Sequence, residues 1–184
     1  MCRISGIASH QVSTESLSLR IQQMNDCQKH GGPDGEGATV HAELGVALGH
    51  RRLALLDLSL AGMQPMLDQS SNYEILFNGE IYNYLEIRLE LIALGYQFNN
   101  QTDTEVILNA YIQWGDLAFK RLNGMFAVAI FDKLKKEKRF VSYSKNEFNA
   151  VEFFMGLSPE IFEQLKDENK KEFAEKFGAV CALF

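Results

Sequence analysis

Cysteine, proline and histidine are scarce in this 184-residue sequence, and each scarcity excludes a class of protein. The chain has 3 Cys, 3 Pro and 4 His. The odd number of cysteines, without a CxxC spacing, excludes a disulfide framework and indicates a reducing compartment. The histidines are scattered without an HExxH spacing, so we expect no metal site. The N-terminus also lacks the charged segment and apolar run of a secretory leader, which together with the cysteines predicts a cytoplasmic protein.

Basic charge and long apolar runs are equally sparse. The 18 Lys and Arg are outnumbered by 24 Asp and Glu, for a net charge of -6. No basic field therefore exists to attract nucleic acid or anionic lipid. No apolar run approaches the about 20 residues of a membrane span, and no GxxxxGK[ST] loop predicts nucleotide binding. What remains is a globular chain, 46% apolar, of a length that suits one domain with or without an appendage.

Short apolar runs separated by turn residues predict several strands. The predicted strands are residues 4–9, 39–41, 46–48, 53–58, 73–77, 96–98 and 126–131. Residues 53–58 are almost continuously apolar, which favours a buried strand, and Asn78-Gly79 permits a tight turn. The Gly-rich residues 30–37 are expected to form a loop. Because there is no regular βαβ period and several connections are too short for a parallel crossover, we predict an α+β fold with antiparallel sheets.

Capping residues and helical spacing predict helices between these strands. Ser13 or Thr14 caps the first helix, Gly95 ends a second helix over residues 83–94, and residues 102–105 have capping-box spacing at the start of a third. The inward positions are predicted to be Leu17, Ile21 and Met24 in the first helix and Leu85, Leu89 and Ile92 in the second. Beyond residue 144 the sequence is charged and helix-prone, with a helix start at Ser158-Pro159.

Cys2 is the residue whose position suggests chemistry. If Met1 is removed, as is usual before a small residue, Cys2 carries a free α-amino group. The reference pKa of that amine, roughly 7.7–8.0, lies near the thiol value of about 8.5, so the amine can accept the thiol proton directly or through a water. The thiolate can then attack a carboxamide or ester carbon. The alternative is that Cys2 is a small apolar residue at the start of a strand.

Five segments occur in an order that resembles a known family. They are Cys2, the loop at residues 30–37, residues 49–57, the Asn-Gly-Glu-Ile-Tyr-Asn segment at residues 78–83, and residues 102–105. Over residues 1 to about 138 they resemble the glutaminase domain of class II glutamine amidotransferases, most closely that of asparagine synthetases. The resemblance implies the N-terminal-nucleophile αββα sandwich, in which two antiparallel sheets are covered by helices. We expect this domain over residues 1–143, a divergent helical extension over residues 144–184, and no synthetase domain.

The resemblance assigns catalytic roles to three residues. Cys2 would attack the side-chain amide of L-glutamine, release ammonia and form a thioester that water hydrolyses to glutamate. The Asn78 side-chain amide and the Gly79 backbone N–H would form the oxyanion hole, where removing one donor typically costs about 2.7–4 kcal/mol of transition-state stabilisation. Without the resemblance, Asn78-Gly79 would be read as an ordinary hairpin turn.

Substrate-binding roles follow from the same resemblance. Arg52 would bind the α-carboxylate of glutamine bidentately, and Asp103 would bind its α-ammonium group. The pocket would be completed by Glu80 and by backbone groups of Leu53, Ala54, Leu55 and Leu56. Without the resemblance, Arg52 would be a surface charge and Asp103 a helix-start acid that complements the macrodipole.

Two departures from the family pattern favour an alternative function. Arg3 stands where the family commonly has Gly, and Gly31 stands where it commonly has Arg. A guanidinium near the sulfur would lower the pKa of Cys2 or crowd the pocket entrance, and the glycine adds backbone freedom to the loop. The alternative is a catalytically impaired glutamine-binding or interaction module. The glutaminase part of a sugar-phosphate or purine amidotransferase is a third possibility, which residues 80–83 disfavour.

The resemblance also concerns the fate of the ammonia. In a full synthetase, ammonia aminates activated aspartate, and ATP and Mg belong to the synthetase domain. The Ser-Gly-Gly pyrophosphate loop of that domain is not found here, so we expect no cofactor in this chain. The acceptor would be a separate synthetase chain, and a homo-oligomer is a further possibility.

Overall fold

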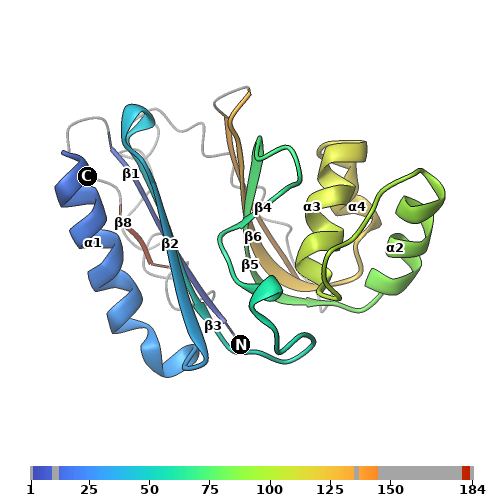
Figure 1. Cartoon of the computed structure of the whole chain (residues 1–184), viewed down its shortest axis with the longest axis horizontal. Coiled ribbons are helices and arrows are strands. Elements are labelled where there is room, and N and C mark those ends of the chain that lie inside the picture. Colours follow the sequence, from blue (N-terminus) through green and yellow to red (C-terminus); the bar gives the residue numbers. More distant parts are fainter. Residues whose placement is uncertain (1, 10–12, 135–136, 145–179, 183–184) are drawn as a thin grey trace.

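Two stacked four-stranded sheets form the centre of the molecule, with helices on the outer face of each (Figure 1). The computed structural model describes residues 2–9, 13–134, 137–144 and 180–182. The resulting order of layers is helix, sheet, sheet, helix, as the αββα prediction requires.

The first sheet carries the N-terminal strand next to its centre. Its strand order is β2-β3-β1-β8, and the strands are β1 (Arg3–Ala8), β2 (Gly35–His41), β3 (Val46–Arg52) and β8 (Val180–Ala182). β3 pairs antiparallel with both β1 and β2, whereas β8 pairs parallel with β1. The strand that begins just after Cys2 is therefore paired on both sides.

The second sheet is antiparallel throughout and has one largely open edge. Its order is β4-β5-β6-β7, and the strands are β4 (Met66–Leu67), β5 (Tyr73–Ile81), β6 (Gly124–Asp132) and β7 (Glu137–Ser144). β6 pairs with β5 along its whole length, but β4 pairs only with Glu74 and Ile75. The part of β5 beyond Ile75 thus offers backbone groups on its β4 side that no strand takes up.

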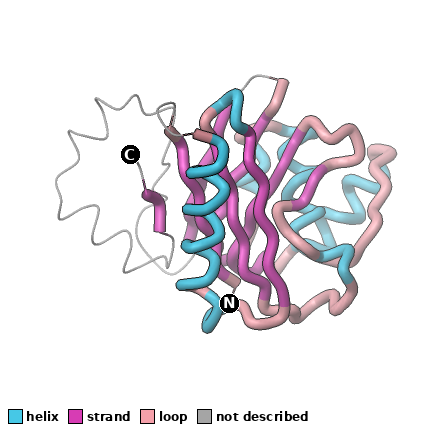
Figure 2. Tube along the Cα trace, turned by 60° about the vertical axis from the view of Figure 1, so that its left-hand side comes forward, coloured by secondary structure: helices cyan, strands magenta, loops and turns pink. Residues whose placement is uncertain are grey.

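Helix α1 (Thr14–Cys27) covers the first sheet (Figure 2). Ser13 caps it, because its side chain accepts a hydrogen bond from the Ser16 N–H. Leu17 and Ile21 are buried against Ile7 and Ala47 of the sheet. The predicted cap and inward face of this helix are confirmed.

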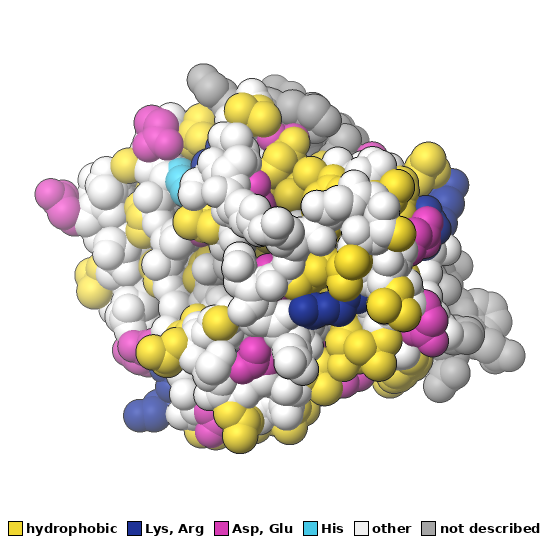
Figure 3. Space-filling view, turned by 45° about the vertical axis from the view of Figure 1, so that its right-hand side comes forward, with side chains coloured by type: hydrophobic (Ala, Val, Ile, Leu, Met, Phe, Trp, Pro, Cys, Tyr) yellow, Lys and Arg dark blue, Asp and Glu magenta, His cyan; other side chains and the backbone are white. Residues whose placement is uncertain are grey.

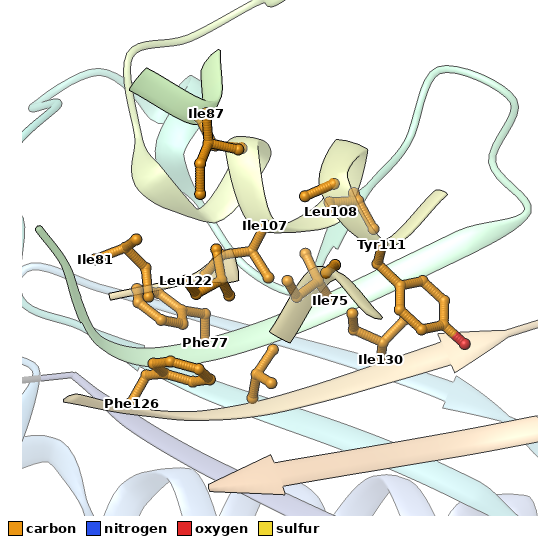
Figure 4. Close-up of a cluster of buried hydrophobic side chains, with 14 of the residues drawn as sticks. Ile75, Phe77, Ile81, Ile87, Ile107, Leu108, Tyr111, Leu122, Phe126 and Ile130 are labelled. Atoms are coloured by element: carbon orange, nitrogen blue, oxygen red, sulfur yellow. The ribbon is translucent and has the colours of Figure 1, made fainter. Parts of the chain in front are cut away.

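Three helices cover the second sheet: α2 (Tyr84–Ala93), α3 (Asp103–Trp114) and α4 (Leu117–Arg121). Figure 4 shows the core beneath them, where isoleucines and phenylalanines of β5 and β6 meet the apolar face of α3. Thr102 caps α3 through a 3.3 Å bond from the Glu105 N–H. The Glu105 carboxylate accepts hydrogen bonds from the Asn99 and Asn100 N–H groups. The residues before α3 and the first turn of α3 are therefore bonded to each other in both senses, as donor and as acceptor.

Two predicted strands and one turn are wrong. Residues 53–58 form a loop after β3, and Leu55 and Leu58 are exposed, because polar contacts at Arg52 and Ala54 replace strand pairing there. Residues 96–98 have no strand partner among the described residues. Asn78-Gly79 lies inside β5 and makes no turn; a Cβ at Gly79 would lie 2.3 Å from the Met125 carbonyl oxygen, so glycine serves close strand approach there.

The predicted inward face of α2 is also wrong. Leu85, Leu89 and Ile92 are exposed, whereas Ile87 and Leu91 are buried. Both sets have helical spacing, because this helix is apolar on most of its circumference, and periodicity alone does not choose between them. Figure 3 shows hydrophobic side chains exposed on the side of the molecule that the helices of the second sheet cover.

Two further observations concern the rest of the chain. The predicted helix at Ser158-Pro159 falls outside the described residues, and the described part of the C-terminal segment is strand β8. Among the helices of the described residues, none combines the length and the apolar character needed to cross a membrane.

Candidate active site

An open pocket lies where the start of β1, the ends of β3 and β5 and the start of α3 come together. The space it encloses, including the part open to solvent, is about 550 Å³. Its lining residues are Cys2, Arg52, Leu53, Ala54, Leu55, Leu56, Asp57, Gly62, Gln64, Phe77, Gly79, Glu80, Thr102, Asp103 and Thr104. The pocket thus joins four parts of the chain: Cys2 and residues within 52–64, 77–80 and 102–104.

The Cys2 thiol is held by the backbone of one residue. The Leu53 N–H donates to Sγ at 3.3 Å, and Sγ lies 3.5 Å from the Leu53 carbonyl oxygen. The side chain is half-buried, whereas Cys27 is exposed. The two contacts hold the sulfur at the pocket wall.

The Arg3 side chain lies against Gly31. A Cβ at Gly31 would be 2.7 Å from Arg3 Nε and 2.8 Å from Cγ and Cζ. Arg3 Nη1 also donates to the Cys2 carbonyl oxygen at 3.0 Å. Arg3 is not among the pocket-lining residues, so it does not crowd the entrance. The two departures from the family pattern are in direct contact, and the glycine provides the space that the arginine occupies.

The open edge of β5 presents a row of N–H groups to the pocket. The Phe77 N–H donates to Gln64 Oε1 at 2.6 Å, and the Ile81 N–H donates to Asp103 Oδ2 at 3.1 Å. Backbone N–H groups of alternate residues in a strand point to the same side. The N–H of Gly79, midway between these two, is therefore directed to the same side, where Gly79 lines the pocket.

Asp103 is the buried acid of the site, with 5% of its surface exposed. Burial is the main cause that raises its pKa to about 6, and the nearby Glu80 charge adds to it, while the hydrogen bond from Ile81 N–H opposes the rise. A cation placed beside the carboxylate would relieve this cost.

Arg52 is buried at the end of β3 and shapes the loop that follows. Its Nη1 donates to the Ser59 carbonyl oxygen at 2.6 Å, and its Nη2 donates to the carbonyl oxygen of Asp57. The Ala54 N–H donates to Asp34 Oδ2 at 2.9 Å. Residues 53–59 are consequently curled around the guanidinium, and their backbone becomes a wall of the pocket.

Most of the residues predicted for the site are brought together. Those that line the pocket are Cys2, Arg52, Leu53, Ala54, Leu55, Leu56, Gly79, Glu80 and Asp103. Asn78 does not line it; it is buried, and its Oδ1 has no hydrogen-bond partner among the described residues. By strand alternation its side chain shares the face of Leu76, which packs toward the first sheet and β1.

The sequence analysis missed several lining residues. These are Asp57, Gly62, Gln64, Phe77, Thr102 and Thr104. Asp57, Phe77, Thr102 and Thr104 stand inside or beside the quoted motifs, so motif position was a usable signal for them. Gly62 and Gln64 lie in an irregular segment without periodicity, and only the fold brings them to the site.

The histidines of the described residues do not line the pocket. His50 is fully buried in β3, and its burial, followed by the charge of Arg52, lowers its pKa to about 4. It is therefore neutral at physiological pH. No group of three or more His, Cys, Asp or Glu that could hold a metal ion occurs in the described part of the chain.

Comparison with known proteins agrees with this geometry. Residues 1–143 match the family model of the glutamine amidotransferase domain. The chain is 42% identical over 135 residues to the glutamine-hydrolysing asparagine synthetase 1 of Bacillus subtilis, covering 72% of this chain and 21% of that protein. It is 32% identical over 156 residues to asparagine synthetase B of Escherichia coli, covering 85% and 27% of the two chains. This chain thus spans only about a fifth to a quarter of the length of these relatives.

A solved structure has the same fold. The glutamine phosphoribosylpyrophosphate amidotransferase of B. subtilis, complexed with ADP and GMP, superposes with a TM-score of 0.55 at 19% sequence identity. The match covers 77% of this chain and 36% of that one. The predicted N-terminal-nucleophile sandwich is thereby confirmed.

Proposed function

This chain belongs to the glutamine amidotransferase domain family and is related to asparagine synthetases, and from that premise we propose that its pocket hydrolyses L-glutamine to glutamate and ammonia. The proposal is supported above all by one observation: the Cys2 thiol, the Gly79 edge, Arg52 and Asp103 line a single pocket. We further propose residues 1–143 as the catalytic domain and residues 144–184 as an extension of it.

Recognition of glutamine would use two charged side chains that line the pocket. Asp103, whose carboxylate is costly to bury alone, would bind the α-ammonium group. Arg52 would bind the α-carboxylate, adding a charged partner to the two carbonyl oxygens it already holds. Both partners are nearly fully buried, so their attraction for the ligand is weakly screened by solvent. A free amino acid is the ligand that satisfies both.

The chemical step begins after removal of Met1. The α-amine of Cys2 takes the thiol proton, and Sγ attacks the δ-carbon of the glutamine amide. The Gly79 N–H would stabilise the oxyanion, and the Asn78 side-chain amide would join it after turning from its buried position toward the pocket. The carbon–nitrogen bond then breaks, and the amine returns its proton to the leaving ammonia. Water attacks the thioester, with the amine as general base, to give glutamate and the free thiol.

The ammonia acceptor belongs to the larger proteins that this chain resembles. Because the relatives are asparagine synthetases and extend well beyond the matched region, we propose that the ammonia serves the amination of aspartate. The synthetase activity would be provided in another chain or another part of the same protein. The Mg and ATP requirements would belong to that part.

Glutamate release tests the proposal. Purified protein is incubated with L-glutamine, and glutamate and ammonia are measured for the wild type, Cys2→Ala and Cys27→Ala. Cys27→Ala is the matched control, because Cys27 is an exposed free thiol outside the pocket. We expect turnover in the wild type and in Cys27→Ala, and none in Cys2→Ala.

Intact-mass spectrometry checks the premise of the mechanism. Loss of Met1 is expected, since only then does Cys2 carry a free amine. Glutamine binding by calorimetry, with no turnover in any protein, would instead support the impaired binding module. If the wild type shows neither glutamine binding nor glutamine turnover, both functions are refuted.

A further inference from the structure

Gln64 joins two walls of the pocket through its side-chain amide. It stands two residues before β4 and has only 5% of its surface exposed. Its Oε1 accepts the Phe77 N–H at 2.6 Å, and its Nε2 donates to Thr104 Oγ1 at 3.2 Å. One end of the carboxamide therefore holds strand β5, and the other end holds the first turn of helix α3.

The contact with β5 replaces a missing strand. β4 pairs only with Glu74 and Ile75, so the next outward N–H, that of Phe77, has no strand partner on this side. Gln64 supplies the acceptor. Since alternate residues of a strand are rigidly related, fixing the Phe77 N–H also fixes the direction of the Gly79 N–H two residues further along.

The contact with α3 completes a closed ring around Gly79. Thr104 adjoins Asp103, and Asp103 accepts the Ile81 N–H at 3.1 Å. The ring therefore runs from Phe77 to Gln64, through Thr104 and Asp103, and back to β5 at Ile81. Gly79 is the residue midway along the strand segment that this ring encloses.

The backbone of Gln64 is fixed as well. A Cβ at Gly37 of β2 would lie 2.0 Å from the Gln64 carbonyl oxygen. The loop that carries Gln64 is thus in close contact with the first sheet, while its side chain contacts the second. Because its backbone is fixed, the Gln64 carboxamide has little freedom to move with β5 or with α3 if one of them shifts.

We propose that Gln64 is a positioning residue that sets the separation between the Gly79 N–H and the Asp103 carboxylate, and hence the length of amino acid the pocket accepts. This inference rests on the proposed glutaminase function. The oxyanion would form at Gly79 and the α-ammonium group would bind at Asp103, so a change in their separation alters the fit of glutamine. Asparagine, one methylene shorter, is the natural probe of that length.

Three substitutions separate the two contacts. Gln64→Met keeps the volume and removes both hydrogen bonds. Thr104→Val keeps the Phe77 bond and removes the acceptor on α3, and Thr104→Ser restores that acceptor. Gln28→Met is the matched control, because Gln28 is also a buried glutamine and its side-chain amide has no partner among the described residues.

The kinetic constants report the two contacts differently. We expect Gln64→Met to lower kcat about 10- to 100-fold, as a small misplacement of an oxyanion donor does. Thr104→Val is expected to raise KM for glutamine about fivefold, the effect of one net hydrogen bond, with kcat nearly unchanged. Thr104→Ser should reverse that rise, and Gln28→Met should leave both constants as in the wild type. The ratio of kcat/KM for glutamine over asparagine is expected to fall in Gln64→Met.

Some outcomes overturn the inference. If Gln64→Met is folded and keeps wild-type kcat and wild-type selectivity while the wild type hydrolyses glutamine, the positioning role is refuted and the proposed function stands. If the wild type has no turnover, the same variants are compared by calorimetry for glutamine against asparagine, and unchanged selectivity refutes the role. No amino acid binding by the wild type refutes both. Hydrogen exchange at the Phe77 amide, expected to accelerate in Gln64→Met, reports the contact independently of activity.

Discussion

Replacing Gly31 by alanine is expected to lower the free energy of unfolding by about 1–3 kcal/mol, the usual cost of forcing an extra methyl group into occupied space. The new Cβ would lie 2.7 Å from Arg3 Nε and 2.8 Å from Cγ and Cζ, well inside van der Waals contact. The clash involves Cγ, Nε and Cζ of Arg3, so the arginine side chain must leave its position. Its 3.0 Å bond to the Cys2 carbonyl oxygen would be lost with it.

The size of the effect depends on Arg3, which makes a double-mutant cycle decisive. In an Arg3→Ala background the clash is absent, and Gly31→Ala should stabilise by about 0.4–1 kcal/mol through the entropy of the unfolded chain. The backbone at Gly31 does not have a positive φ, so alanine is compatible with it. We therefore expect a coupling energy of about 1.4–4 kcal/mol between the two positions, the sum of the lost stability and the regained stability.

Urea unfolding of the four proteins measures this coupling. Gly6→Ala in β1 is the matched control, since a Cβ there would meet its nearest atom at 3.7 Å, an ordinary contact. Equal destabilisation by Gly31→Ala with and without Arg3 would show that the contact between them is not the cause. Glutamine turnover measured alongside is expected to fall in Gly31→Ala, because the Cys2 peptide loses a restraint.

Three further predictions follow from burial. Because the pKa of Asp103 is raised from 3.8 to about 6, kcat/KM for glutamine should fall as pH decreases below about 6. The same raised pKa means that protonated Asp103 stabilises the folded protein, and this stabilisation is lost as pH increases through about 6. Asp103→Asn should abolish both pH dependences, which pH-rate profiles and unfolding at several pH values measure. His41→Ala should lower the free energy of unfolding in urea by roughly 1.5–3 kcal/mol, the usual loss of a hydrogen bond to a charged group, because the buried Glu74 side chain loses its 2.6 Å partner. An unchanged free energy of unfolding in His41→Ala would contradict this. In α2, Leu91→Ala should cost about 2–5 kcal/mol, whereas Leu89→Ala should stay within about 0.5 kcal/mol, and thermal unfolding distinguishes this from the opposite order.

The sequence predicts best where local chemistry decides. Ser13 and Thr102 are caps whose side chains reach backbone N–H groups within one turn, and Gly95 ends α2 with a positive φ. Such contacts depend on neighbours in the chain, so sequence alone finds them. The prediction that Cys2, Arg52 and Asp103 share one site has a different origin, since it follows from the resemblance of the ordered motifs to the amidotransferase family.

The failures arise where tertiary contacts decide. In α2 two apolar stripes satisfy the helical period, and only packing on the second sheet selects Ile87 and Leu91. Residues 53–58 are apolar enough for a strand, but the buried guanidinium of Arg52 draws their carbonyl groups into a loop. Gln64 has no local signal at all, since both of its partners lie far away in the sequence.

The short strand β4 has a consequence for self-association. A sheet edge with free backbone groups is a template on which another chain can add a strand. Here the N–H groups of Phe77 and Ile81 are occupied by side chains from two other segments, and the N–H between them faces a pocket. The side chains that bind these N–H groups in the site therefore also prevent a further strand from pairing with this edge of β5. Substitutions at Gln64 or Asp103 would then reopen a template for intermolecular strand pairing, so loss of activity in such variants should be accompanied by a greater tendency to aggregate.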